Sequence, residues 1–132
     1  MKTITELIHA LADKTPKARA EAAETLGKLG NPQAVPALVG ALNDTDPSVR
    51  DAAICALGDL KDRRAVPALI NTLRNDNDPN VRVTAIYILG ELGDPSAIEP
   101  IREALLNATQ ENDWGILVAA DWALDELTRT TT

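Results

Sequence analysis

The sequence lacks most of the residues from which ligand sites and covalent cross-links are built. It contains no Phe, two Trp, one Tyr, one His and one Cys among its 132 residues. Because a disulfide within the chain needs two cysteines, Cys55 cannot form one, and such a residue is most often a small apolar side chain. With so few aromatic residues, any core must be filled by Leu, Ala, Val and Ile, and flat ligands find few surfaces on which to stack.

Basic residues and long apolar runs are also scarce. Thirteen Lys and Arg face twenty Asp and Glu, which gives a net charge of −7. Because Lys and Arg supply most of the affinity for phosphate backbones, we expect no nucleic-acid partner. No apolar run approaches the roughly 20 residues that span a bilayer, so we expect no membrane partner either. Met1-Lys2-Thr3 begins no signal-peptide pattern, and we expect a cytoplasmic protein.

One segment of the chain occurs repeatedly. The segment DPSVRDAAICALGDL at 46–60 is matched by DPNVRVTAIYILGEL at 78–92, with Asp-Pro, Val-Arg and Leu-Gly at the same positions. Related segments begin at Pro16 and near Trp114, so the copies are 31 to 35 residues apart. Periods of this length are typical of solenoids built from helix pairs.

A second segment alternates with the first. Ala-Val-Pro-Ala-Leu stands at 34–38 and again at 65–69, with a looser version at 97–101. The pattern predicts an all-α fold, a right-handed superhelix of about eight helices in antiparallel pairs, as a single domain over 1–132. Its expected parts are a half repeat at 2–13, repeats at 15–44, 45–76 and 77–111, and a terminal half repeat at 112–128.

Asp46 and Asp78 each precede a proline at the start of an expected helix. A carboxylate at this position accepts hydrogen bonds from free backbone N–H groups, and proline is tolerated at the first helical residue. Arg50 and Arg82 follow these caps by four residues, so each can hydrogen-bond its own Asp or the equivalent Asp of the adjoining repeat. We interpret all four residues as structural.

The paired acidic residues at 44–46 and 76–78 raise the alternative of a cation site. A calcium loop of the EF-hand type also requires a third ligand, a glycine and a more distant glutamate. The sequence after Asp46 is instead Pro-Ser-Val-Arg. We therefore expect helix capping here, and neither a metal ion nor a cofactor.

Glycine recurs inside the expected helices at Gly27, Gly58 and Gly90. Glycine in a helix interior costs about 1 kcal/mol relative to alanine. Its recurrence in one register therefore predicts a close approach between helix backbones.

The pattern D-x-D-P-x-V-R-x-x-A-x-x-A-L-G-x-L, followed by D-P-x-A-V-x-x-L, resembles the HEAT-like repeat of the phycobilisome lyase type. The best match lies at 44–50, and the resemblance covers nearly all of 2–128. It implies a helical solenoid of the kind found in bilin lyases, phycobilisome degradation factors and scaffold proteins, in which such Asp and Arg residues tie neighbouring repeats together. The last unit departs from the pattern at Trp114, Leu117 and Asp125, which replace Pro, Arg and Gly.

Candidate catalytic residues are few. His9 and Cys55 belong to helices expected in opposite layers of the solenoid, so they do not form a dyad. HEAT-like deoxyhypusine hydroxylases hold iron through paired His-Glu motifs, which this sequence lacks. We expect no catalytic residues and favour a protein that is not an enzyme.

The helices of the second segment are expected to line a concave surface. Some DNA glycosylases of similar architecture hold DNA on a basic surface of this kind, whereas the expected surface here is neutral to acidic. Its representative residues are His9, Asn43, Asn71, Arg74 and Glu103.

The outward row Glu24, Cys55, Tyr87 and Trp122 becomes less polar toward the C-terminus. We expect an apolar patch there that binds another protein or a second copy of this chain as a homodimer. The alternative is that the last helix turns and buries Trp122 against its neighbour. The expected partner-binding residues are Val83, Tyr87, Trp114, Val118 and Trp122.

Two functions remain. We favour a non-catalytic scaffold or adaptor that binds another protein, which is the usual role of solenoids. The alternative is a bilin lyase-like or chaperone-like protein that acts on phycobiliproteins or another tetrapyrrole carrier. The chain has about half the repeats usual in bilin lyases and few aromatic residues to flank a tetrapyrrole.

Overall fold

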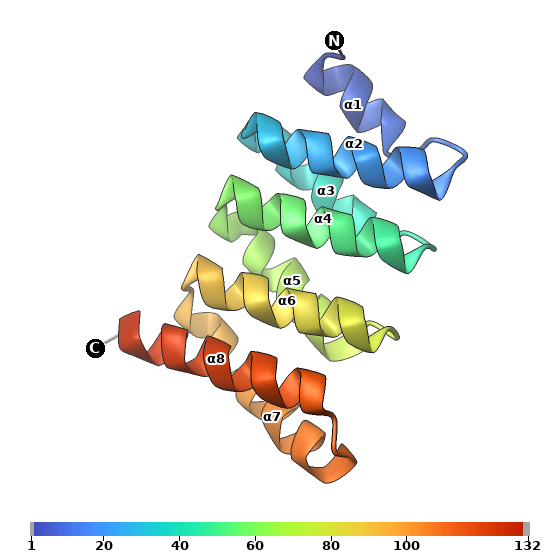
Figure 1. The fold of residues 1–132 in the computed structure, drawn as a ribbon. Helices are drawn as coiled ribbons and strands as arrows, with labels where there is room; N and C mark the ends of the chain where they lie inside the picture. The colour runs from blue at the N-terminus through green and yellow to red at the C-terminus, as the bar shows by residue number, and fades with distance from the viewer. Residues whose placement is uncertain (1, 131–132) are drawn as a thin grey trace. The chain divides into compact units, whose positions relative to one another are not determined.

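The computed structural model describes residues 2–130, and within that range it contains helices and no strand (Figure 1). This confirms the expected all-α class with eight α-helices. Single turns of 3-10 helix at Pro32–Ala34, Arg63–Ala65 and Pro95–Ala97 lead into three of them. The α-helices are α1 (Ile4–Ala10), α2 (Pro16–Leu29), α3 (Val35–Ala41), α4 (Pro47–Leu60), α5 (Val66–Asn75), α6 (Pro79–Leu92), α7 (Ile98–Glu111) and α8 (Trp114–Thr130).

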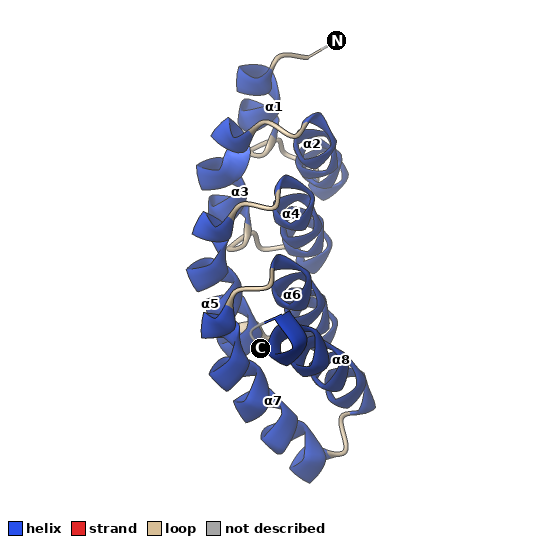
Figure 2. Ribbon diagram, turned by 90° about the vertical axis from the view of Figure 1, so that its left-hand side faces the viewer, coloured by secondary structure: helices blue, strands red, loops and turns tan. Residues whose placement is uncertain are grey.

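The chain divides into two compact units, residues 1–65 and 66–132. In the first unit, α2 packs side by side with α4, while α1 contacts α2 and α3 contacts α4. The second unit repeats this arrangement, because α6 packs against α8, α5 against α6 and α7 against α8 (Figure 2). Each unit is therefore two layers thick, with its even-numbered helices in one layer. The expectation of a single domain stays a prediction.

Helices α2, α4 and α6 begin at capped prolines. Asp46 Oδ1 accepts a hydrogen bond from the Ser48 N–H at 2.8 Å, and Asp78 Oδ1 accepts one from the Asn80 N–H at 2.8 Å. Thr15 has the same role before α2, where its hydroxyl accepts from the Ala18 N–H at 3.3 Å. These side chains satisfy N–H groups that the first turn of a helix leaves free.

The same helices end in left-handed residues. Gly30 follows α2 with φ of 70°, and Gly93 follows α6 with φ of 72°. Lys61 occupies the equivalent position after α4, with φ of 54°. A side chain is disfavoured in this region, so the lysine holds a position that suits glycine.

Leucine, isoleucine, valine and alanine fill the interior of each unit. Leu26, Leu38 and Leu57 are fully buried in the first unit, and Leu89 and Ile101 in the second. Alanine and glycine at the helix contacts let neighbouring helices approach closely, so the larger side chains pack tightly between them.

The close approach expected at the repeated glycines is present in both units. A Cβ atom on Gly27 would lie 2.8 Å from Ala56 Cα, so α2 and α4 touch at their backbones. A Cβ atom on Gly90 would lie 3.1 Å from Ala123 Cα, so α6 and α8 also approach closely. At neither position does an added methyl group fit without displacement of the neighbouring atoms.

Candidate functional site

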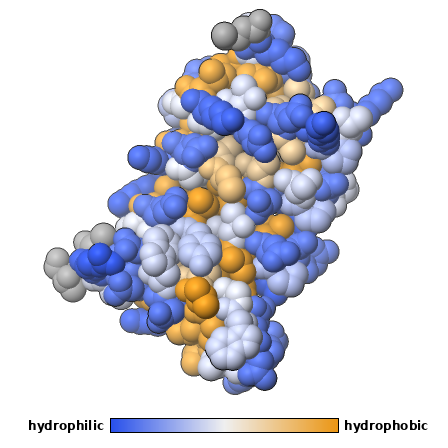
Figure 3. All heavy atoms as spheres, in the orientation of Figure 1, coloured by the Kyte–Doolittle hydropathy of each residue, from blue (hydrophilic) through white to orange (hydrophobic). Residues whose placement is uncertain are grey.

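The five expected partner-binding residues lie on α6 and α8, which are neighbours in the second unit. We call them the C-terminal patch. Trp114 is 73% exposed, Val118 59% and Trp122 36%, while Val83 and Tyr87 are half-buried. Figure 3 shows apolar and weakly polar side chains, in orange and white, gathered over this part of the molecule between hydrophilic ones. Large exposed apolar side chains that adjoin one another commonly mark an interaction site.

The sequence of α8 explains why this patch exists. One side of the helix carries Ile116, Ala120 and Leu127, which are at most 5% exposed and pack into the second unit. A surface helix needs only one such apolar side to fold against its neighbours. Trp114 and Val118 are apolar residues on its other side, so packing inside the unit does not account for them.

The sequence allows Trp122 to be either an exposed binding residue or a residue buried against its neighbour, and its position in the structure is intermediate. Its ring stacks against Tyr87 at a tilt of 46°, with the ring centroids 5.4 Å apart. Its Cζ3 atom is 2.8 Å from the position that a Cβ on Gly90 would occupy. One edge of the indole is therefore packed on α6 while the remainder stays exposed, so Trp122 is neither a fully buried core residue nor a free surface residue.

A cavity of about 310 Å³ lies elsewhere in the second unit, between α5, α7 and the starts of α6 and α8. Its lining includes the cations Arg74 and Arg82 and the carboxylates of Glu103, Glu111 and Asp113. Arg74 and Glu103, both expected on the concave surface, form an ion pair at 3.5 Å. Each is about half exposed, so the pair adds little stability.

The other residues expected on the concave surface are distributed over both units. His9 on α1 and Asn43 after α3 are exposed in the first unit. Asn71 on α5 is exposed in the second unit, where its side-chain oxygen accepts a hydrogen bond from Asn75 at 2.7 Å. In the described part of the chain, no group of three or more His, Cys, Asp or Glu side chains is arranged to hold a metal ion.

The Arg residues after the caps donate hydrogen bonds to backbone carbonyls of the loops that precede their helices. Arg50 Nη1 donates to the backbone carbonyl of Asp44 at 2.9 Å, and Arg82 Nη1 donates to that of Asp76 at 2.8 Å. Each of these two bonds goes to the carbonyl two residues before the cap. The guanidinium thereby ties the start of its own repeat to the last residue of the repeat before it.

Another arginine, Arg19, which the sequence analysis did not single out, joins the two ends of the repeat at 15–44. Arg19 binds the Asp44 carboxylate through two hydrogen bonds of 2.8 and 3.0 Å, across 25 residues. Burial raises the pKa of Asp44, but the bonds from Arg19 and from the Asp46 N–H outweigh it, so the pKa lies below its usual value. Arg19 stands 31 residues before Arg50, so the repeat register contained the signal for this residue.

Comparison with known proteins supports the fold. A family model described as HEAT repeats matches residues 4–78 and 66–131. No curated protein matches the chain. No helix among residues 2–130 combines the length and apolar character needed to cross a membrane.

The solved structures that resemble this chain include the following three. The complex of CpcE and CpcF of phycocyanin lyase from Nostoc sp. PCC7120 is 33% identical over 96% of this chain and 53% of the matched chain, with a TM-score of 0.79. Human deoxyhypusine hydroxylase in complex with glycerol is 27% identical over 97% of this chain and 44% of its own, with a TM-score of 0.82. An engineered protein, 21% identical over 96% of this chain and 63% of its own, has a TM-score of 0.69 and shares the fold. The chain spans about half the length of the first two.

Proposed function

The chain belongs to the HEAT repeat family, and we propose that it is a non-catalytic scaffold or adaptor that binds another protein through the C-terminal patch. The observation that carries this proposal is the second apolar side of α8. Trp114 and Val118 are the most exposed members of the patch, and packing within the unit does not require them.

The composition of the patch supports a protein partner. Trp and Tyr are the side chains most often found as anchors in protein interfaces, because each contributes a large apolar area with few rotatable bonds. Trp122 and Tyr87 hold each other in place by stacking, so little freedom remains to be lost on binding. The similarity to a chain from a solved complex of two proteins, CpcE and CpcF, points the same way.

The experiment is capture from the native host with two forms of the chain. One form is the unaltered protein, and the other combines Trp114→Ala with Val118→Ser. Both residues are exposed, so we expect the double variant to keep its helical circular dichroism and its melting temperature. A protein that binds the unaltered chain and is lost from the variant supports the proposal. Equal capture by both forms contradicts it.

The similarity to phycocyanin lyase favours a second candidate function, a lyase-like or chaperone-like protein that acts on phycobiliproteins or another tetrapyrrole carrier. We rank it second because the cavity of about 310 Å³ is at the low end for small-molecule sites, which are typically about 300 to 1,000 Å³. Addition of a bilin to the protein, followed by its visible absorption spectrum, tests this candidate. An unchanged spectrum contradicts it.

A further inference from the structure

The charge of the chain is divided unevenly between its two units. The first unit, 1–65, has nine Lys and Arg and nine Asp and Glu, and so has no net charge. The second unit, 66–132, has four Arg and eleven Asp and Glu, and carries the whole net charge of −7. The C-terminal patch therefore belongs to a unit that repels anions and attracts cations.

Acidic residues continue the rows from which the patch is made. On α8, Trp114, Val118 and Trp122 are followed along the same side of the helix by Asp125, while Asp121 adjoins Trp122. On α6, Val83 and Tyr87 are followed four residues later by Glu91. All three carboxylates are exposed. The surface thus has an apolar half near the start of α8 and an acidic half toward the helix ends.

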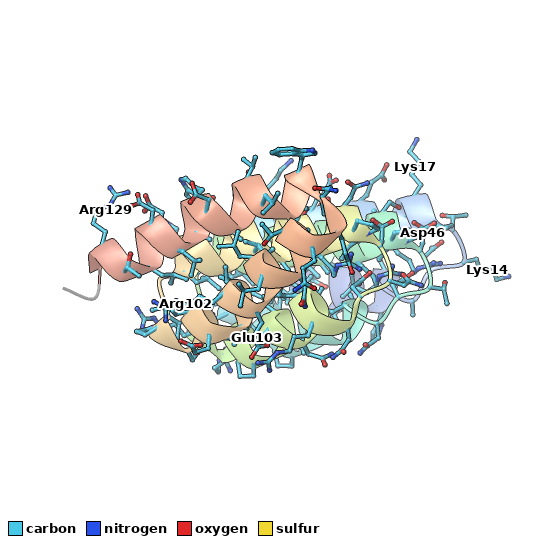
Figure 4. The ribbon with its side chains drawn as sticks, turned by 90° about the horizontal axis from the view of Figure 1, so that it is seen from below. Lys14, Lys17, Asp46, Arg102, Glu103 and Arg129 are labelled. Atoms are coloured by element: carbon cyan, nitrogen blue, oxygen red, sulfur yellow. The ribbon has the colours of Figure 1, made fainter. Side chains whose placement is uncertain are left out.

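The arginines of the second unit neutralise only one of these three carboxylates, Asp125. Arg129, at the C-terminal end of α8, binds Asp125 at 2.8 Å and Glu126 at 2.6 Å (Figure 4). Arg102 on α7 binds Glu99 at 2.7 Å, and Arg74 pairs with Glu103. Asp121 and Glu91 adjoin the apolar half, and no hydrogen bond or ion pair of their side chains is seen in the described part of the chain. They remain available to a cation from outside.

We infer that the partner segment that covers the C-terminal patch is an amphipathic, basic protein helix, with apolar anchors for the patch and Lys or Arg side chains for Glu91 and Asp121. This inference rests on the proposed function and names the chemistry of its partner. A helix that lies along the exposed side of α6 and α8 presents anchors at the same spacing as the patch residues. Charge complementarity speeds encounter and selects such a partner over acidic ones.

A second copy of the chain fits the surface less well. Each copy would bring a unit of charge −7 to the contact, and this repulsion opposes association. A membrane rich in anionic lipid is opposed for the same reason. Self-association and vesicle binding are accordingly outcomes that would overturn the inference.

The test uses three synthetic peptides of about 18 residues. The first is an amphipathic helix with Leu and Trp on one side and Lys on the other. The second has Glu in place of each Lys, and the third contains the residues of the first in an order that is not amphipathic. Each is titrated into the full chain, and binding is followed by calorimetry. We expect the first peptide to bind at least about tenfold more tightly than the other two. Its affinity should fall as the salt concentration rises from about 0.05 to about 0.5 M.

Two variants of the chain locate the binding. The double change Glu91→Gln and Asp121→Asn should weaken binding of the first peptide about tenfold or more, and so should Trp114→Ala combined with Val118→Ser. If the Lys and Glu peptides bind equally well and both lose binding to the Trp114→Ala and Val118→Ser variant, the inference of a basic partner is overturned. The proposed function would then still stand. Binding that neither variant weakens would overturn the inference, as would dimerisation in sedimentation or binding to anionic vesicles that Val118→Ser abolishes.

Discussion

The ring of Trp122 lies on the backbone of Gly90, so closely that a methyl group on that glycine would stand 2.8 Å from Trp122 Cζ3. Real side chains do not approach at this distance without displacement. The glycine therefore sets how closely α8 packs on α6, and it determines how much of Trp122 remains at the surface. The candidate interaction site and the packing of the second unit depend on the same contact.

Gly90→Ala should destabilise the second unit by about 1 to 3 kcal/mol, even though alanine is the better helix former by about 1 kcal/mol. The added methyl group would meet Trp122 and the backbone of Ala123. Gly40→Ala is the matched control, because a Cβ on this exposed residue of α3 meets nothing within 4 Å. It should raise stability by up to about 1 kcal/mol. Urea unfolding of both variants measures the difference, and a shift of the same sign in both would contradict this packing.

Trp122→Ala and Trp114→Ala should separate the two roles of the patch. Trp122 is 36% exposed and packs on Gly90 and Tyr87, so its removal should cost about 2 to 3 kcal/mol, below the range for a fully buried Trp. Trp114 is 73% exposed, so its removal should change stability by no more than about 0.5 kcal/mol. Thermal unfolding monitored by circular dichroism compares the stabilities of the two variants. Equal losses of stability would contradict the packing described for Trp122.

Asp44→Ala should destabilise the first unit by about 2 kcal/mol, since it removes the acceptor of two bonds from Arg19 and of one from the Asp46 N–H. Glu24→Ala, an exposed change on α2, is the control and should stay within about 0.5 kcal/mol. Chemical unfolding at neutral pH provides the comparison.

The contribution of Asp44 to stability should also decrease at low pH. Its pKa in the folded chain lies below the ordinary 3.8, so its contribution is fully present above about pH 5 and is lost as the pH falls through the lowered pKa. The stability difference between the unaltered chain and Asp44→Ala should therefore shrink on acidification from about pH 6 to about pH 3. A difference that grows at low pH would contradict the bonding assigned to this carboxylate.

Lys61→Gly should stabilise the chain by about 1 kcal/mol. Lys61 has φ of 54°, and glycine already occupies the equivalent positions at Gly30 and Gly93. Glycine adopts this conformation without the strain that a Cβ causes, and this gain exceeds its entropic cost at a helix end. Thermal melting tests the prediction, and a lower melting temperature for Lys61→Gly would refute it.

Much of the fold could be predicted because its signals are local. An Asp-Pro pair starts α4 and α6 through bonds that span two or three residues, and the apolar spacing of each helix is set within a few turns. The repeat then multiplies each local signal. The left-handed position of Lys61 could also have been found, since it aligns with Gly30 and Gly93.

The candidate site could be predicted only in part. The members of the C-terminal patch follow from helical spacing, but the exposed fraction of Trp122 depends on how closely α8 packs on Gly90, which is a property of two helices together. The bond from Arg19 to Asp44 crosses 25 residues, and no short-range rule pairs two residues this far apart. The bonds from Arg50 and Arg82 to the backbone carbonyls of Asp44 and Asp76 depend on the path of the loop before each helix, which the spacing of the residue types does not specify.

The most direct test of the proposed protein interaction is site-specific photo-crosslinking in the native host. A photoreactive amino acid replaces Val118 in one form of the chain and Glu24 in the other, since both positions are exposed on the same layer of their units. The account predicts one protein cross-linked at position 118 and absent at position 24. Cross-linking of the same proteins with equal yield at both positions, or none at position 118, would contradict it.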